Sequence, residues 1–116
     1  MKHFVGFLFL VLSLTVYAED TVDIAHMVET GVIIDVRTVE EWDAGHIEGA
    51  NLIPLEQVAA GISDIAADKD TPVLLYCRSG RRAGAAQETL LKMGYTNVVN
   101  LGGIIDAQKT LDQLPD

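Results

Sequence analysis

The chain has 116 residues, of which 49% are hydrophobic, and it carries a formal net charge of −9 at pH 7. This length corresponds to one domain, because domains commonly have roughly 100–200 residues. The negative charge argues against a nucleic-acid-binding protein, which needs positive charge to neutralise phosphates. The single cysteine excludes an intramolecular disulfide and a cysteine-based zinc site, and the apolar content is too high for a disordered chain.

Residues 1–18 have the features of a secretory signal peptide. A positive charge at Lys2 precedes the apolar run of residues 4–14, and Val16-Tyr17-Ala18 precedes acidic residues. The apolar stretch is shorter than the ~20 residues that cross a bilayer comfortably. We expect cleavage after Ala18, a mature domain over residues 19–116, a periplasmic or secreted location and no membrane attachment after cleavage. An uncleaved membrane anchor is the alternative.

Helical and strand-like patterns alternate along the mature chain. Short apolar runs rich in β-branched residues predict buried strands, and amphipathic periodicity predicts helices between them. In chain order, the patterns predict helix 22–30, strand 32–36, helix 38–45, strand 50–53, helix 55–66, strand 73–76, helix 82–93, strand 97–101 and helix 104–113. Short apolar strands separated by helices are typical of a parallel sheet covered on both faces, so we expect a single α/β domain.

Several helix ends are marked by specific residues. Thr38 and Glu41 have the spacing of a capping box, in which each side chain accepts a backbone N–H at the start of a helix. Gly31 is expected to stop the first helix, and Gly94 has the position of a left-handed C-cap. These signals predict where the elements around the central strands begin and end.

The only cysteine, Cys77, follows the apolar strand 73–76 and precedes a helix. Ligands of parallel sheets bind beyond the carboxyl ends of the strands. Backbone N–H groups at a helix N-terminus favour an anion, and Gly80 allows the loop to bend. Because Arg78, Arg81 and Arg82 are close in sequence, we expect Cys77 to be held as a reactive thiolate in a small cationic site on an acidic domain.

Each of these residues also allows a simpler interpretation. A cysteine at the end of an apolar strand can be a small buried hydrophobic residue. Arg78 can be a solvated surface residue, and Arg82 can form a salt bridge that holds the loop. A phosphate-binding loop of the cysteine-phosphatase type needs Cys-x5-Arg, but Ala83 occupies the required position. This spacing argues against tyrosine-phosphatase or arsenate-reductase chemistry.

Several motifs in order along the chain resemble the rhodanese domain. They are Asp35-Val36-Arg37, the string GHIEGA at 45–50, CRSGRR at 77–82, Gly94-Tyr95 and Leu101-Gly102-Gly103. The chain looks most like the small single-domain periplasmic rhodaneses of the phage-shock-response type. The resemblance covers about residues 22–108 and implies a parallel sheet of four to five strands with helices on both faces.

This resemblance implies a thiosulfate sulfurtransferase whose catalytic nucleophile is Cys77. Cys77 would take a sulfane sulfur from thiosulfate as a persulfide and pass it to cyanide or a thiol acceptor. The expected substrate-binding residues are Arg78, Ser79, Gly80, Arg81 and Arg82. We expect no metal and no cofactor apart from the covalent persulfide. The expected partners are a small anionic sulfur donor and a thiophilic acceptor, and we expect a monomer.

Four further residues are expected to support the site or the fold. Asp35 and Arg37 begin a turn beside the predicted site, and we interpret them as a scaffold pair, with direct substrate contact as the alternative. His46 is expected to hydrogen-bond within a turn, and Trp42 is expected to pack in the core.

Two other functions stay open at this stage. A non-catalytic rhodanese module could bind a partner or carry sulfur without turnover, although such modules often lack the loop cysteine that Cys77 provides. A cysteine phosphatase or arsenate reductase is the second, and the loop spacing disfavours it.

Overall fold

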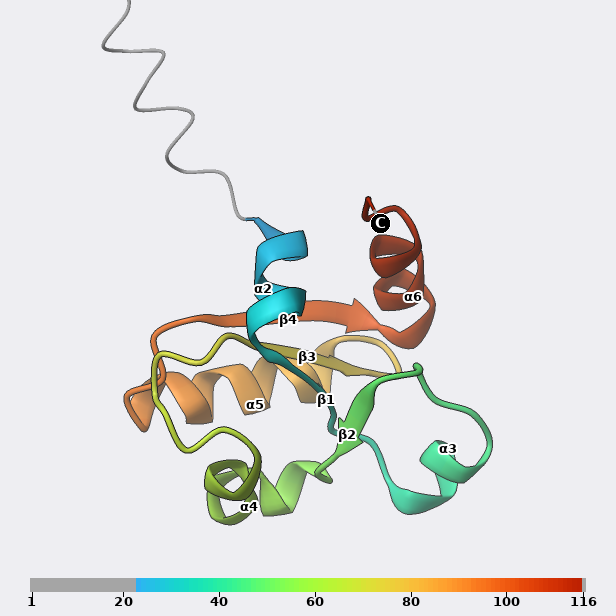
Figure 1. Ribbon diagram of the computed structural model, residues 1–116. Helices are drawn as coiled ribbons and strands as arrows, with labels where there is room; N and C mark the ends of the chain where they lie inside the picture. Colours follow the sequence, from blue (N-terminus) through green and yellow to red (C-terminus); the bar gives the residue numbers. More distant parts are fainter. Residues whose placement is uncertain (1–22, 116) are drawn as a thin grey trace, which may run out of the picture.

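A four-stranded parallel sheet forms the centre of the domain (Figure 1). The computed structural model describes residues 23–115, so the predicted signal peptide lies outside the described residues. The strands lie in the order β2-β1-β3-β4, and each neighbouring pair is parallel. Their bounds are Val32–Asp35 for β1, Ala50–Leu52 for β2, Val73–Cys77 for β3 and Val98–Gly103 for β4. The predicted parallel α/β architecture is confirmed.

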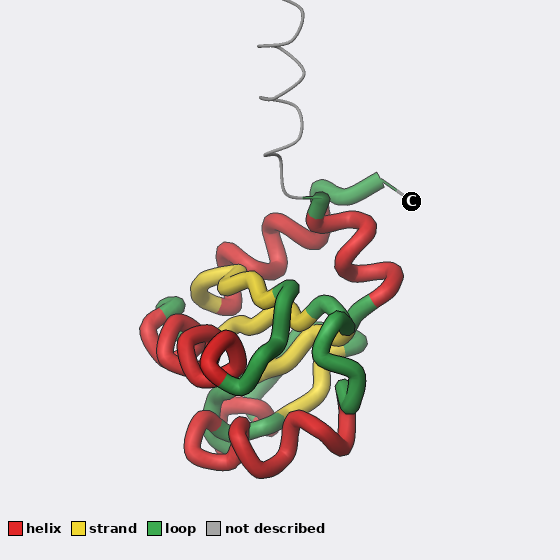
Figure 2. Tube along the Cα trace, turned by 90° about the vertical axis from the view of Figure 1, so that its left-hand side faces the viewer, coloured by secondary structure: helices red, strands yellow, loops and turns green. Residues whose placement is uncertain are grey.

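Helices cover both faces of this sheet, as the two perpendicular views show (Figures 1 and 2). Helices α4 and α5 lie on one face, and α2 and α6 lie on the other. A short helix, α3, lies to one side of the sheet near the ends of β1 and β2 (Figure 1). The helix bounds are Ile24–Thr30 for α2, Val39–Asp43 for α3, Val58–Ile65 for α4, Arg81–Lys92 for α5 and Ile104–Asp112 for α6.

The hydrophobic core is divided by the sheet into two clusters. Successive side chains of a strand point to opposite faces, so an apolar strand buried on both sides serves both clusters. In β3, Leu75 joins the cluster that contains Leu90 of α5. Its neighbour Leu74 joins the cluster that contains Met27 of α2 and Ala107 of α6. All five residues of β3 are buried, which explains its uninterrupted apolar sequence.

Two predicted boundaries differ from the structure near the cysteine. Cys77 is the last residue of β3 rather than the first residue after it, and α5 begins at Arg81, so the loop contains only residues 78–80. Gly80 caps α5 with a φ of 94°, in the left-handed region that glycine adopts without strain. The predicted helix 55–66 begins with a 3-10 turn, Leu55–Gln57, before α4.

The expectation that Trp42 packs in the core is wrong. Helix α3 contributes no buried residue, and Trp42 is only half-buried. Its ring stacks on the His46 ring, with the ring centroids 3.5 Å apart and the planes inclined by 4°. His46 Nδ1 also lies 3.0 Å from the Trp42 carbonyl oxygen, which agrees with the expected turn contact of this histidine. A helix this short and lateral to the sheet can stack its indole locally without reaching either core cluster.

None of the helices within residues 23–115 combines the length and the apolar character needed to span a membrane.

Candidate functional site

The predicted site residues gather at the carboxyl edge of the sheet. Because β1 and β3 are adjacent and parallel, the segments that follow them leave from the same edge, with Asp35 in register with Tyr76. The next strand, β4, brings Gly103 into register with Cys77. The topology therefore places the turn after β1, the cysteine loop and the Gly102-Gly103 end of β4 beside one another.

The sulfur of Cys77 is buried and accepts backbone hydrogen bonds. Gly80 N–H donates to Sγ over 2.9 Å, and Ala83 N–H in the first turn of α5 donates over 3.4 Å. Each of these donors belongs to the loop or to the free N–H groups at a helix start, where the helix dipole also favours negative charge. The geometry therefore directs two backbone N–H donors at the sulfur at the end of β3.

A hollow lies beside the loop, on the side of α5 and the 3-10 turn. It has a volume of about 500 Å³, and the lining residues are Leu55, Ser79, Arg81, Arg82 and Ala85. The side chains of Arg78, Ser79 and Arg81 are all exposed to solvent. The hollow thus combines two guanidinium groups with the loop that carries the cysteine.

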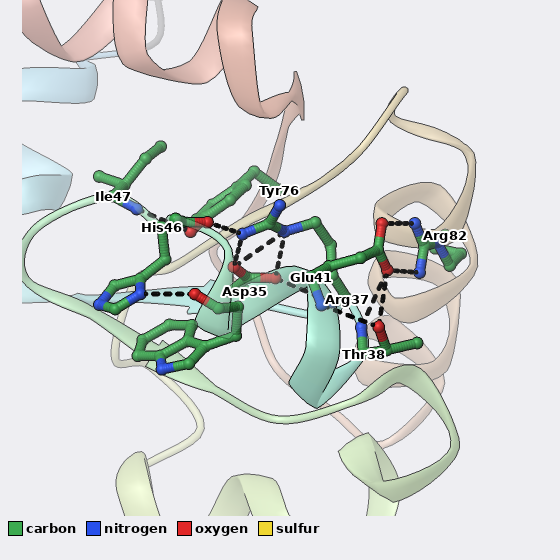
Figure 3. A network of polar contacts seen from close by, with 10 residues as sticks. Asp35, Arg37, Thr38, Glu41, His46, Ile47, Tyr76 and Arg82 are labelled. Atoms are coloured by element: carbon green, nitrogen blue, oxygen red, sulfur yellow. Dashed lines mark hydrogen bonds and ion pairs between the residues drawn. The ribbon is translucent and has the colours of Figure 1, made fainter.

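The three loop arginines differ in their partners. Among residues 23–115, the ion pairs at this edge involve Arg82 and Arg37 but neither Arg78 nor Arg81. The Arg82 guanidinium donates two hydrogen bonds to the Glu41 carboxylate, of 2.7 and 2.9 Å (Figure 3). This salt bridge is the alternative role that the sequence allowed for Arg82.

Glu41 connects the cysteine loop with α3. The predicted capping box is present: Thr38 Oγ1 accepts the Glu41 N–H, and the Glu41 carboxylate accepts the Thr38 N–H. The ion pair with Arg82, followed by the hydrogen bond from Thr38 N–H, lowers the pKa of Glu41 to about 2. The sequence predicted Glu41 only as a helix cap, because a partner 41 positions along the chain leaves no local signal.

Asp35 and Arg37 form a buried pair. The Arg37 Nε and Nη2 donate to the Asp35 carboxylate over 2.8 to 3.0 Å, and the Arg37 N–H donates to the same group. Arg37 Nη2 also donates to the Gly45 carbonyl over 2.7 Å. The hydrogen bonds to Asp35 raise the pKa of Arg37, and the bonds of Arg37 to Asp35 and Gly45 join β1 to the segment after α3 (Figure 3).

Tyr76 is a further member of this network. Its hydroxyl accepts the Ile47 N–H over 3.1 Å, and the Arg37 guanidinium carbon lies 5.6 Å from the centre of its ring. Burial raises the pKa of Tyr76 to about 12, and the neighbouring Asp35 carboxylate also raises it. From the sequence, Tyr76 was expected only as the end of an apolar strand. Its hydroxyl, the one polar side-chain group in the run 73–76, was the signal that could have indicated a polar contact.

The Gly102-Gly103 end of β4 packs directly on the cysteine loop. A Cβ atom at Gly103 would collide with the Arg78 carbonyl oxygen, so only glycine permits this approach. Asn100 in β4 donates from Nδ2 to the Gly80 carbonyl over 3.0 Å and accepts the Gly102 N–H on Oδ1 over 2.8 Å. Sequence analysis singled out the glycines and missed Asn100.

The part of the chain that the structure describes holds no group of three or more His, Cys, Asp or Glu side chains placed to bind a metal ion.

Comparison with known proteins identifies the family. Residues 20–109 match the Rhodanese-like domain family. The chain belongs to that family. It is 45% identical over 73 residues to thiosulfate sulfurtransferase PspE of Escherichia coli, covering 63% of this chain and 70% of PspE. It is 40% identical over 78 residues to a protein named sulfurtransferase from Allochromatium vinosum, covering 66% and 71% of the two chains.

A solved structure supports the same assignment. The structure described as rhodanese with anions from E. coli superimposes with a TM-score of 0.64 at 43% sequence identity. The match covers 66% of this chain and 89% of that rhodanese. The family match and the superimposed structure therefore confirm the rhodanese-like family, which the sequence motifs resembled.

Proposed function

We propose that this protein is a secreted thiosulfate sulfurtransferase that carries sulfane sulfur on Cys77. The observation that carries the proposal is the Cys77 sulfur at the end of β3, which accepts N–H groups from Gly80 and Ala83 beside an arginine-lined hollow. Relatives named thiosulfate sulfurtransferase and sulfurtransferase support the same reaction class. In this proposal Arg78, Ser79, Gly80, Arg81 and Arg82 form the anion-binding loop.

The first half-reaction loads the cysteine. The Cys77 thiolate attacks the outer sulfur of thiosulfate, an S–S bond forms on Cys77, and the S–S bond of thiosulfate breaks. Sulfite leaves with the bonding electron pair, so no external oxidant or proton is needed. The exposed Arg78 and Arg81 attract the doubly charged donor, and Gly80 and Ala83 N–H groups stabilise negative charge on the bound sulfur.

The second half-reaction returns the cysteine to its starting state. Cyanide or a thiolate acceptor attacks the terminal sulfur of the persulfide, and the Cys77 thiolate leaves with the electron pair of the broken S–S bond. Because loading and unloading are separate steps, the proposal implies ping-pong kinetics.

The structure disfavours the phosphatase and arsenate-reductase alternative. The position that Cys-x5-Arg chemistry requires holds Ala83, which is fully buried in the first turn of α5. A methyl group there supplies no guanidinium for a phosphoryl group. The proposed donor is therefore a sulfur compound rather than a phosphate ester.

Intact-mass spectrometry tests the proposal. After treatment of reduced protein with thiosulfate, Cys77 should gain about 32 Da, the mass of one sulfur atom. Cyanide should then remove this mass and release thiocyanate. The Cys77→Ser variant is the matched control and should gain no mass and show no transfer.

Other results would overturn the assignment. Repeated turnover in Cys77→Ser would exclude a Cys77 persulfide. A stable adduct that no acceptor discharges would indicate a sulfur-carrying module without turnover. Faster hydrolysis of an aryl phosphate than transfer from thiosulfate would restore the phosphatase alternative.

Secretion and the monomeric state are part of the same proposal. The charged start, apolar run and Ala18 site support export. The mass of the protein isolated from its host would locate the cleavage site, and light scattering would measure the number of chains in solution.

A further inference from the structure

Asn100 links the cysteine loop to the glycine end of its own strand, β4. It is half-buried in β4, two residues before the first of the two glycines, Gly102 and Gly103, that end this strand. Its Nδ2 donates to the Gly80 carbonyl, and its Oδ1 accepts the Gly102 N–H. Exchanging the amide oxygen and nitrogen would place donor against donor and acceptor against acceptor, so only one orientation of this side chain satisfies both contacts.

The Gly80 carbonyl is held from two sides. Besides Asn100 Nδ2, it accepts the Gly84 N–H in the first turn of α5, over 2.9 Å. With the carbonyl fixed, the φ of 94° and the ψ of −15° at Gly80 together set the direction of the Gly80 N–H, which donates to Cys77 Sγ. Without such an anchor, Gly80 in this loop could adopt other conformations, because glycine populates both signs of φ.

We propose that Asn100 is a positioning residue for sulfur transfer. It anchors the Gly80 carbonyl so that the Gly80 N–H stays on the Cys77 sulfur, before and after that sulfur takes up a second one. The hydrogen bonds of Asn100 go to Gly80 and Gly102, and Asn100 does not line the hollow, so it acts through Gly80. The kinetic consequence rests on the proposed sulfurtransferase function, whereas the effect on the Gly80 N–H does not.

A matched pair of variants separates this role from general packing. Asn100→Leu keeps a similar shape and removes both hydrogen bonds without adding charge. Gln87→Met is the control, because Gln87 of α5 is also half-buried and donates its amide to a β4 carbonyl, that of Val98, over 3.0 Å. Both changes remove an amide contact that involves β4, but only the Asn100 contact reaches the cysteine loop.

Two measurements are made on both variants and on the unmodified protein. Amide hydrogen exchange by NMR reports how well the Gly80 N–H is held, and single-turnover mass spectrometry reports the rate of sulfur uptake from thiosulfate. Loss of one net hydrogen bond corresponds to about a 3- to 10-fold change in an equilibrium or rate. We expect Asn100→Leu to raise Gly80 exchange and lower uptake by about this factor.

The outcomes decide the proposal. The proposal is supported if Asn100→Leu shows faster Gly80 exchange and slower sulfur uptake while Gln87→Met shows near-normal values of both. Normal Gly80 exchange in Asn100→Leu, or an equal slowing in both variants, overturns it. If Asn100→Leu does not fold, Asn100→Asp retains the acceptor for Gly102 N–H and is read by the same Gly80 exchange. If the unmodified protein takes up no sulfur, the proposed function fails and Gly80 exchange alone decides the role of Asn100.

Discussion

Two segments leave neighbouring strands at the same edge of the sheet, and they use their charges in opposite ways. At the end of β1, the carboxylate of Asp35 and the guanidinium of Arg37 are buried and bond to each other. At the end of β3, the Cys77 sulfur is buried, but Arg78 and Arg81 in the chain that follows are exposed. Arg82, in the first turn of α5, links the two segments because it pairs with Glu41 of α3.

The difference separates scaffold from site. A charge with a built-in partner resists movement and is neutralised before any ligand arrives. A charge that extends from an exposed loop stays available to attract an anion, at little cost in stability. The segment at the end of β1 therefore gives rigidity to the edge. In the proposed function, the segment at the end of β3 provides the reactive sulfur and the charges that bind its donor.

Breaking the buried pair has the largest expected effect on stability. Arg37→Leu leaves the Asp35 carboxylate buried without its partner, which typically costs about 3–5 kcal/mol. Urea unfolding followed by circular dichroism measures this loss. The double variant Asp35→Asn with Arg37→Leu removes the uncompensated charge, so it should be more stable than Arg37→Leu alone. Equal stability of the single variant and the unmodified protein would contradict a structural role for the pair.

Removing an exposed charge beside the hollow should affect the binding of thiosulfate rather than the stability of the fold. Arg81→Ala is expected to raise the KM for thiosulfate about 10-fold, which corresponds to about 1.4 kcal/mol, because a guanidinium next to the hollow is lost. Its unfolding free energy should stay within about 0.5 kcal/mol of the original, as for most surface changes. Lys92→Ala, at the exposed far end of α5, is the control and should leave the KM unchanged. A change in stability without a change in KM would place Arg81 with the scaffold.

The ion pair between Glu41 and Arg82, which links the two segments, has the smallest expected effect on stability, and this effect depends on pH. The pKa of Glu41 in the folded protein is about 2, below the ordinary value of 4.5, so its stabilisation is present above pH 4.5 and is lost as the pH falls toward 2. Because the ion pair is partly exposed, we expect a contribution of about 1 kcal/mol.

Unfolding of Glu41→Gln at several pH values measures this contribution. The difference from the unmodified protein should be about 1 kcal/mol at pH 6 and should shrink below pH 4. Glu40→Gln, at the exposed neighbouring position of α3, is the matched control. A difference that stays constant down to pH 2 would show that the Glu41 charge is not the source of the stabilisation.

Much of the fold could be predicted because its signals are local. The apolar runs at β1 and β3, the capping box of Thr38 and Glu41, and the left-handed Gly94 all act within a few residues. Trp42 shows where local reasoning fails. Aromatic character favours burial, but whether a core lies beneath α3 depends on where the chain places that helix.

The sequence by itself determined the cysteine loop, because Cys77, Gly80 and the arginines follow one another between a strand and a helix. It also determined the family, through motifs whose order and spacing can be read directly. Only the tertiary structure decided that Arg82 pairs with Glu41 and that Asn100 holds the Gly80 carbonyl. The physical reason is that side chains far apart in the chain meet only after parallel strands align their carboxyl ends, and no local pattern encodes which partner each one finds there.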